Sequence, residues 1–235
     1  MSRNLLLLSS SRSADTGFLE ACEEEIRDTL KGVKRVLFIP YAIIGEENRG
    51  RIGMVEERCR ALGVQMDNIE DVENHAEAVE KAEAVLVSGG NTFCLLDAMY
   101  RNNVIEPLRK RVAGGMPYIG WSAGSNVAGK SIRTTNDMPI VYPPSFDALG
   151  LVGFQLNPHF TDAMPPGHRG ETRRDRLAEF LSVNPHEKVV AIREGSGLRV
   201  TGDTMRLAGE HDGLLFTSDA EPVMLAAGRD LSHLL

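Results

Sequence analysis

Short apolar runs alternate with amphipathic segments along most of the chain. Continuous apolar runs predict strands that are buried on both faces, and apolar positions three and four residues apart predict the helices that cover them. The predicted strands lie at 4–9, 34–40, 64–69, 83–88, 116–121, 152–157 and 188–193, and the predicted helices at 16–31, 53–62, 74–82, 91–101, 103–113 and 170–183. Strands that alternate with helices favour a parallel sheet with helices on both faces.

The pattern changes after Gly197. Short alternating runs separated by Gly and Asp turns occupy 198–201, 204–207, 214–217 and 222–226. Such runs predict antiparallel hairpins, which we expect at one edge of the sheet. The length of 235 residues is typical of a single α/β domain spanning 1–235.

The composition and charge of the chain limit the classes of molecule that it is expected to bind. The chain is 42% hydrophobic and 25% charged, and its formal net charge is −7. Because no block rich in Lys and Arg is present, nucleic acid and anionic membranes are poor candidate partners. Three cysteines far apart in sequence indicate neither a disulfide framework nor a thiolate metal site, and no apolar run is long enough to span a membrane. A cytoplasmic location is therefore expected.

A candidate nucleophile stands at one corner between a strand and a helix. Ser122 is flanked by Gly120 and Gly124 in a G-x-S-x-G arrangement. A serine on such a strained turn needs small neighbours, and the N-terminus of the following helix would stabilise a developing oxyanion beside it. A plain Gly/Ser turn between a strand and a helix is the alternative interpretation.

A second strand–glycine–helix junction precedes this corner. The run Ser88, Gly89, Gly90, Asn91 and Thr92 ends one predicted strand and opens a helix. Backbone N–H groups at the glycines would supply one half of an oxyanion hole, with the N–H of Ala123 as the other. A glycine-rich turn in which Asn91 caps the helix is an equally good interpretation.

A serine hydrolase also needs a base and an acid to orient it. In open α/β sheets such groups collect at the carboxyl ends of the strands, and His159 and Glu194 both follow predicted strands. Asp137 lies in a polar loop after Ser122, where it would orient the base or hold a substrate amine. The choice between Glu194 and Asp137 as the orienting acid stays open.

Two other site chemistries fit less well. His159, Asp162 and His168 could ligate a metal, but neither an H-x-x-x-H nor an HExxH spacing supports a metal site. The order Ser, His, Glu argues against an α/β-hydrolase esterase, in which the acid precedes the histidine, unless Asp137 or Asp147 is the acid.

Four segments resemble the S51 serine peptidases of the peptidase E type, which are α-aspartyl dipeptidases. The segments are 120–124 (Gly-Trp-Ser-Ala-Gly), 132–140 (Ile-Arg-Thr-Thr-Asn-Asp-Met-Pro-Ile), 157–160 (Asn-Pro-His-Phe) and 170–173 (Gly-Glu-Thr-Arg). The resemblance spans nearly the whole chain and weakens after about residue 195. It implies a flavodoxin-like three-layer sandwich with a mostly parallel sheet, related to class I glutamine amidotransferases, in which the corresponding corner usually carries cysteine.

The resemblance also implies an activity and residue roles. The family hydrolyses dipeptides with an N-terminal aspartate through an acyl-enzyme, without a cofactor. By motif, Ser122 resembles the nucleophile, His159 the base and Glu194 the third member of the triad; Gly90 and Ala123 would donate the oxyanion-hole N–H groups. Asp137 falls within the family's Thr-Asn-Asp stretch. An S51 hydrolase acting on isoaspartyl or cyanophycin-type peptides and a non-catalytic aspartyl-peptide binding protein are the alternatives, and the resemblance allows a homodimer.

An acidic protein that binds an aspartyl side chain needs a local cation. An arginine suits this role because its guanidinium can grip a carboxylate with two parallel hydrogen bonds. Arg133 and Arg173 lie in the matching segments and are the candidates. Together with Asn91 they make up the predicted substrate-binding residues.

Overall fold

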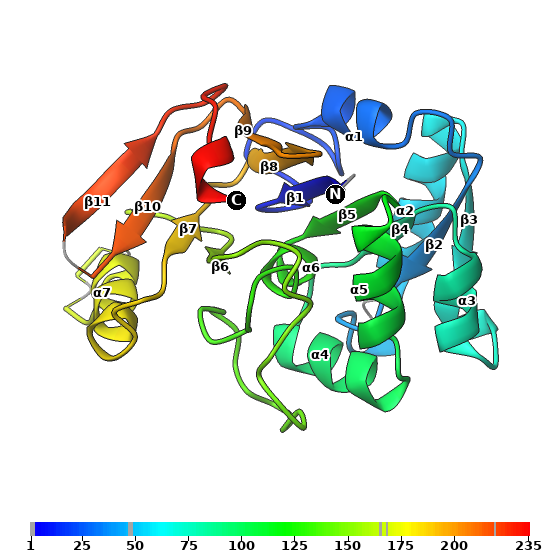
Figure 1. Cartoon of the computed structure of the whole chain (residues 1–235), viewed down its shortest axis with the longest axis horizontal. Coiled ribbons are helices and arrows are strands. Elements are labelled where there is room, and N and C mark those ends of the chain that lie inside the picture. The colour runs from blue at the N-terminus through cyan, green and yellow to red at the C-terminus, as the bar shows by residue number, and fades with distance from the viewer. Residues whose placement is uncertain (1–2, 47–48, 165, 168, 219) are drawn as a thin grey trace.

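A seven-stranded sheet forms the centre of the fold (Figure 1). The computed structural model describes residues 3–46, 49–164, 166–167, 169–218 and 220–235. In spatial order the strands are β3 (Gln65–Asn68), β2 (Arg35–Ile39), β4 (Val85–Val87), β5 (Tyr118–Trp121), β1 (Asn4–Leu8), β8 (Ser196–Thr201) and β9 (Thr204–Gly209). The strands from β3 to β1 pair in parallel, and β8 and β9 add an antiparallel hairpin at the β1 edge. The predicted parallel sheet is confirmed.

Helices cover both faces of this sheet because its strands are apolar on both sides. The helices are α1 (Glu23–Thr29), α2 (Gly50–Leu62), α3 (His75–Lys81), α4 (Thr92–Arg101), α5 (Ile105–Ala113), α6 (Ala123–Asn126) and α7 (Arg173–Val183), with short 3₁₀ turns η2 (Ile69–Asp71) and η3 (Ser232–Leu234). Along β1, Leu5 and Leu7 pack with apolar residues of α3, α4 and α5, whereas Leu6 and Leu8 pack with α1 and α2. Burying each such leucine contributes about 2 kcal/mol.

A second, four-stranded sheet corrects the prediction for the C-terminal hairpins. Its order is β11 (Ala220–Leu225), β10 (Gly213–Thr217), β7 (Val189–Ala191) and β6 (Gln155–Asn157), of which β6 and β7 are parallel. The hairpins therefore join two different sheets instead of one edge. Leu214 and Phe216 of β10 are buried against α7 and Phe160, which explains why this hairpin lies on β7 and not on the main sheet; α7 is seen beside it at the left of Figure 1.

The helix predicted over 16–31 is wrong for its first part. Helix α1 starts only at Glu23, and the preceding residues form turns in which Leu19 has a φ of +52°. The N–H groups of Ser13 and Gly17 donate to the side chains of Thr16 and Glu20, so local polar contacts compete with the helix. The apolar residues of this segment still pack into the same cluster as α1.

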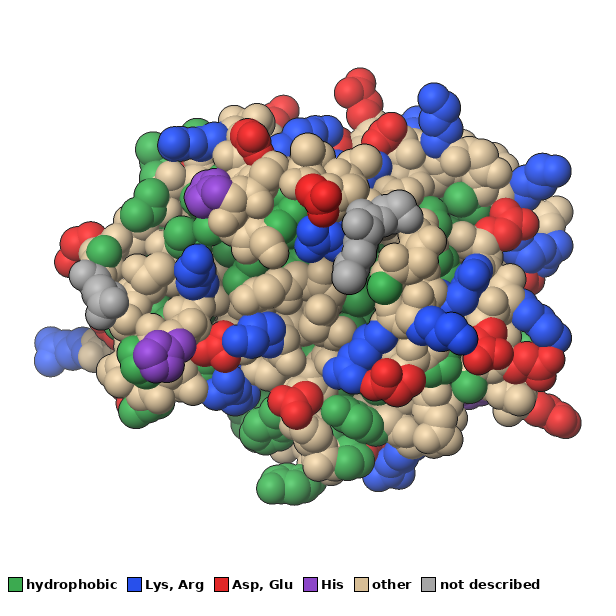
Figure 2. All heavy atoms as spheres, viewed as in Figure 1, with side chains coloured by type: hydrophobic (Ala, Val, Ile, Leu, Met, Phe, Trp, Pro, Cys, Tyr) green, Lys and Arg blue, Asp and Glu red, His purple; other side chains and the backbone are tan. Residues whose placement is uncertain are grey.

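The surface carries charges of both signs. On the face shown in Figure 2, basic and acidic side chains are interspersed, and hydrophobic side chains gather at the lower edge. No helix within the described ranges has the length and apolar character needed to cross a membrane.

Candidate active site

Ser122 occupies a strained corner between β5 and α6. Its backbone has φ 53° and ψ −114°, a conformation that non-glycine residues rarely adopt. A Cβ on Gly120 would lie 2.4 Å from the carbonyl oxygen of Gly124, and one on Gly124 would lie 2.2 Å from that of Val87. Both glycines are therefore required by the close approach of the backbone around the serine.

Gly90 and Ala123 present backbone N–H groups beside this corner. Gly90 has a φ of +140°, and a Cβ there would lie 2.0 Å from the carbonyl oxygen of Ala42. Ala123 is the first residue of α6, where an N–H has no partner within the helix. Within the described chain neither N–H donates a hydrogen bond, so both are available to a ligand oxygen.

Three side chains predicted from the sequence meet in one hydrogen-bonded line. The Oγ of Ser122 lies 2.8 Å from Nε2 of His159, and Nδ1 of His159 lies 2.6 Å from Oε1 of Glu194. His159 follows β6 and Glu194 follows β7, so both stand at carboxyl ends of parallel strands. A proton on Nδ1 of His159 would be donated to Glu194, which leaves Nε2 to accept the serine proton.

The buried Ser9 joins the two sheets beneath His159. The backbone N–H of His159 donates to Oγ of Ser9 (2.8 Å), and this hydroxyl donates to the carbonyl of Ile192 (2.8 Å). Ser122 belongs to the main sheet, whereas His159 and Glu194 follow strands of the second sheet, so these bonds help to hold the three side chains in register. Ser9 was not predicted from the sequence, although its position at the end of the first apolar run placed it at this sheet edge.

Asp137 and Asn91 lie at the N-terminus of α4. Oδ2 of Asp137 accepts hydrogen bonds from the N–H of Thr92 (2.7 Å) and from the hydroxyls of Thr92 (2.5 Å) and Thr135 (3.2 Å). Oδ1 of Asn91 accepts from the N–H of Cys94, and its amide donates to the carbonyl of Met138. Asn91 therefore caps α4, as the alternative interpretation of this junction expected. Among described residues, the carboxylate bonded to His159 is that of Glu194, and Oδ1 of Asp137 accepts no bond.

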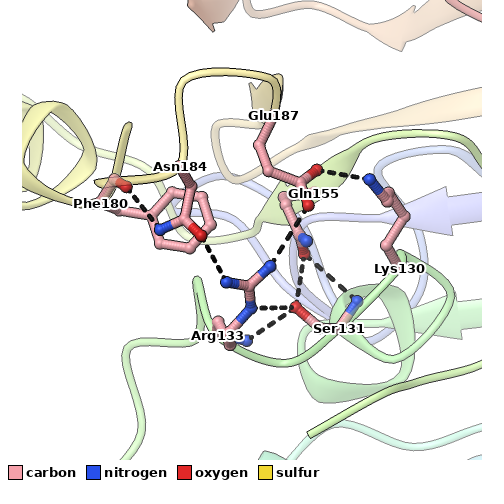
Figure 3. Close-up of polar contacts among 7 residues, drawn as sticks. All are labelled: Lys130, Ser131, Arg133, Gln155, Phe180, Asn184 and Glu187. Atoms are coloured by element: carbon pink, nitrogen blue, oxygen red, sulfur yellow. Dashed lines mark hydrogen bonds and ion pairs between the residues drawn. The ribbon is translucent and has the colours of Figure 1, made fainter. Parts of the chain in front are cut away.

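Arg133 is engaged in a network at the C-terminal end of α7 (Figure 3). Its guanidinium donates to Oδ1 of Asn184 (2.7 Å), Oε1 of Glu187 (3.2 Å) and Oγ of Ser131 (3.1 Å), and its Cζ lies 5.1 Å from the ring centroid of Phe180. Figure 3 shows these partners surrounding the guanidinium. Each of its three guanidinium nitrogens therefore already donates a hydrogen bond to a protein group.

Arg173 differs from Arg133 in that one of its nitrogens has no hydrogen-bond partner among the described residues. It is the first residue of α7, and the helix places it roughly 16 Å from the end where Arg133 binds. Its Nη1 is buried and has no hydrogen-bond partner in the described part of the chain. Burial lowers the pKa of the Arg173 guanidinium and nearby Arg176 adds to this, while the negative charges of Glu194 and Asp137 act in the opposite direction. A partly buried cation with a buried donor that is unused among the described residues is suited to bind an anionic group.

The two described residues that were considered for a metal, His159 and Asp162, are occupied by other contacts. Asp162 forms ion pairs with Arg174 and Arg193, whose hydrogen bonds hold the pKa of this carboxyl below its usual value. His168 lies outside the described residues. Among the residues that are described, no three His, Cys, Asp or Glu side chains gather as metal ligands would.

A cavity of about 800 Å³ opens on the side of Ser122 that faces α1 and α2. Its walls come from residues 10–14, Phe18, the first turn of α2, residues 88–90 and Trp121, and it reaches Ser122, His159 and Glu194. We call it the leaving-side cavity. Its arginines, Arg12 and Arg51, were not predicted from the sequence, because they come from a loop and a helix that only the folded chain brings together.

Comparisons with known proteins agree on one family. The model of a family described as "Peptidase family S51" matches residues 5–208. A protein named peptidase E from Shewanella denitrificans is 47% identical over 235 residues, covering 100% of both chains. Another of that name, from Pasteurella multocida, is 46% identical over 221 residues, covering 93% of this chain and 94% of the relative.

Two solved structures share the fold. The crystal structure of a peptidase from an acI-B1 actinobacterium superposes with a TM-score of 0.70 at 20% identity, covering 98% of this chain and 97% of that chain. A protein from Listeria monocytogenes EGD-e superposes with a TM-score of 0.68 at 23% identity, covering 89% of this chain and 99% of the other. The superposition on the actinobacterial structure extends over almost the full length of this chain.

Proposed function

Since the chain belongs to peptidase family S51, we propose that it is a serine dipeptidase that hydrolyses dipeptides with an N-terminal aspartate. The observation that carries this proposal is the pair of contacts made by His159, 2.8 Å to Ser122 and 2.6 Å to Glu194. A neutral serine is a weak nucleophile, and a base in contact with its hydroxyl is what activates it.

The proposed reaction proceeds through an acyl-enzyme. Oγ of Ser122 attacks the carbonyl carbon of the aspartyl residue while Nε2 of His159 takes the hydroxyl proton. The N–H groups of Gly90 and Ala123 stabilise the oxyanion. When the C–N bond breaks, His159 gives its proton to the leaving amine, and the second amino acid departs. Water then attacks the ester, His159 takes its proton and returns it to Ser122, and aspartate is released.

Recognition of aspartate is proposed on the side of Ser122 that faces α4 and α7. Arg173 would bind the side-chain carboxylate of the substrate, because its buried Nη1 lacks a partner among the described residues. Asp137 would bind the α-amino group through its unoccupied Oδ1, and Asn91 lies beside it. Of the two arginines predicted from the sequence, Arg133 is the weaker candidate, since each of its guanidinium nitrogens already donates to a protein group.

We also propose the finer assignments that the family suggests. The order of the parallel strands and the helices on both faces support a flavodoxin-like sandwich of the class I glutamine amidotransferase type, within one peptidase domain. The free cysteines Cys22, Cys59 and Cys94 support a reducing, cytoplasmic environment.

The proposal is tested by hydrolysis of a substrate panel. Wild-type protein with a chelator present is offered Asp-Leu, Glu-Leu, Asn-Leu, isoAsp-Leu and a p-nitrophenyl ester, and release of leucine or nitrophenol is measured. We expect cleavage of Asp-Leu to exceed that of the other peptides. If isoAsp-Leu is cleaved and Asp-Leu is not, isoaspartyl peptides are the substrates. Absence of any turnover would favour a binding protein.

A second prediction concerns Arg173. Replacing it by glutamine is expected to raise KM for Asp-Leu by about tenfold or more, because a hydrogen bond to a charged group contributes about 1.5–3 kcal/mol. KM for Asn-Leu should change little, since this substrate lacks the side-chain carboxylate. Steady-state kinetics on both peptides measure the difference.

Arg133→Gln is the matched control for this prediction. It should leave KM for Asp-Leu close to the wild-type value and lower Tm, because the network of Figure 3 loses its centre. Equal increases in KM for Asp-Leu and Asn-Leu in the Arg173 variant would show that Arg173 does not bind the aspartyl carboxylate.

A further inference from the structure

The leaving-side cavity has an apolar wall built on Trp121. Phe18 meets the Trp121 ring edge-on with ring centroids 6.1 Å apart, and Phe38 stacks on Trp121 at an interplanar angle of 8°. Met54 from the first turn of α2 and Ile43 complete this wall. Because Trp121 directly precedes Ser122, the apolar wall begins beside the nucleophile and continues away from α4 and α7.

Two exposed arginines line the same cavity, and neither has an acidic partner among the described residues. Arg12 holds its Cζ 6.0 Å from the ring centroid of Phe18 and donates to the sulfur of Met54, while Arg51 stands one helical turn from Met54. Within the described chain neither arginine forms an ion pair, whereas the neighbouring Arg49 pairs with Glu70. Two cations beside an apolar wall match an amino acid that carries both an apolar side chain and a carboxylate.

We propose that the leaving-side cavity binds the second residue of the dipeptide, with the apolar wall taking its side chain and Arg12 and Arg51 binding its C-terminal carboxylate. This inference rests on the proposed dipeptidase function. It assigns the aspartyl residue and the leaving residue to opposite sides of Ser122. It also makes the C-terminal carboxylate, and not the chain length as such, the feature that selects dipeptides.

The charge of the substrate supports this assignment. An Asp-Xaa dipeptide with a neutral second side chain carries two carboxylates and one ammonium group, so it is an anion at neutral pH. The protein itself has a formal net charge of −7, and its general field repels such a substrate. Binding therefore requires a local cation for each carboxylate. Arg173 serves the first, and Arg12 with Arg51 serves the second on the other side of the nucleophile.

The carboxylate of the second residue is also within chemical reach of the site. In a dipeptide it is separated from the scissile nitrogen by a single α-carbon, so it must lie close to Ser122 and His159 when the carbonyl is attacked. The cavity that holds Arg12 and Arg51 contacts both of these residues. An amide at this end of the substrate would leave the guanidinium groups without their anionic partner.

The test compares Asp-Leu with its C-terminal amide, Asp-leucinamide. Binding of each peptide to Ser122→Ala protein is measured by titration calorimetry, with and without Arg12→Gln and Arg51→Gln, and hydrolysis by the corresponding variants with Ser122 intact is measured in parallel. Each arginine substitution is expected to weaken Asp-Leu binding about tenfold, and the pair of substitutions more, because charged hydrogen bonds are lost. Binding of Asp-leucinamide should change less than about twofold, since neutral groups gain little from either arginine.

Arg49→Gln is the matched control, because Arg49 lies two residues before Arg51, at the N-cap of α2, but pairs with Glu70 outside this cavity. This substitution should change the binding of neither peptide. If the arginine substitutions weaken the binding of Asp-Leu and Asp-leucinamide equally, or weaken neither, the proposed carboxylate site is overturned. If Asp-Leu is hydrolysed but the arginine substitutions do not weaken its binding more than that of Asp-leucinamide, the carboxylate site alone is overturned. Arginine-dependent binding of Asp-Leu without any hydrolysis would support that site and overturn the dipeptidase function.

Discussion

Alanine at position 122 is expected to lower kcat for Asp-Leu by about 10⁴-fold or more, because the nucleophile that forms the acyl-enzyme is lost. The fold should remain intact. The hydroxyl of Ser122 makes one hydrogen bond within the described chain, to His159, so the free energy of unfolding should change by no more than about 1 kcal/mol. Leucine release at saturating substrate and thermal unfolding followed by circular dichroism measure the two quantities.

Ser182→Ala is the matched control for this loss of activity. Ser182 is an exposed serine whose hydroxyl donates to a carbonyl in its own helix, and it lies at the end of α7 opposite to Arg173. Its removal should leave kcat and KM at wild-type values. Persistent hydrolysis of Asp-Leu by the Ser122 variant, at more than a trace level, would mean that another group attacks the peptide.

The sheet could be predicted because its strands carry apolar residues on both faces. The run of leucines in β1 illustrates this, since alternate members pack into the two opposite clusters. The start of α1 could not be predicted from the same pattern. Leu19 and Cys22 are buried and Phe18 is partly buried, as a helix would place them. However, the side chains of Thr16 and Glu20 accept hydrogen bonds from the N–H groups of Ser13 and Gly17, and the chain folds into turns instead.

The meeting of Ser122, His159 and Glu194 followed from one physical regularity, that functional groups collect at the carboxyl ends of parallel strands. The regularity holds although the residues come from two separate sheets, whose existence the hydrophobic pattern did not reveal. The buried hydroxyl of Ser9 is part of the reason, because it ties the end of β1 to the loops after β6 and β7.

The choice between Arg133 and Arg173 required the folded structure. Both arginines stand in polar segments that match the family, so their sequence context does not separate them. Their difference lies in partners from distant parts of the chain: Arg133 finds Asn184 and Glu187, whereas a buried nitrogen of Arg173 finds none among the described residues. The leaving-side cavity was beyond prediction for the same reason, since its walls combine loops that lie far apart in sequence.

Replacing Glu194 by glutamine is expected to lower kcat for Asp-Leu by about 10³-fold, with a much smaller change in KM. Glu194 lies 2.6 Å from Nδ1 of His159 and would hold the proton there. A glutamine amide can donate to Nδ1 and so favour the tautomer with its proton on Nε2, which cannot accept the proton of Ser122. The side chain of Glu194 is 54% exposed, so water moderates the loss compared with a fully buried acid. Steady-state kinetics with Asp-Leu measure both constants.

Asp137→Asn separates the two acids that the sequence left as candidates. Asparagine keeps an oxygen that can accept from Thr92, so the N-terminus of α4 should remain capped. The negative charge that we propose for the substrate amine is lost, and KM should rise by about tenfold while kcat falls much less. A fall in kcat without a change in KM for this variant, together with a mild effect of Glu194→Gln, would exchange the roles of the two acids. Because Glu194 contacts the imidazole directly and Asp137 contacts α4, the opposite split between kcat and KM is the expected result.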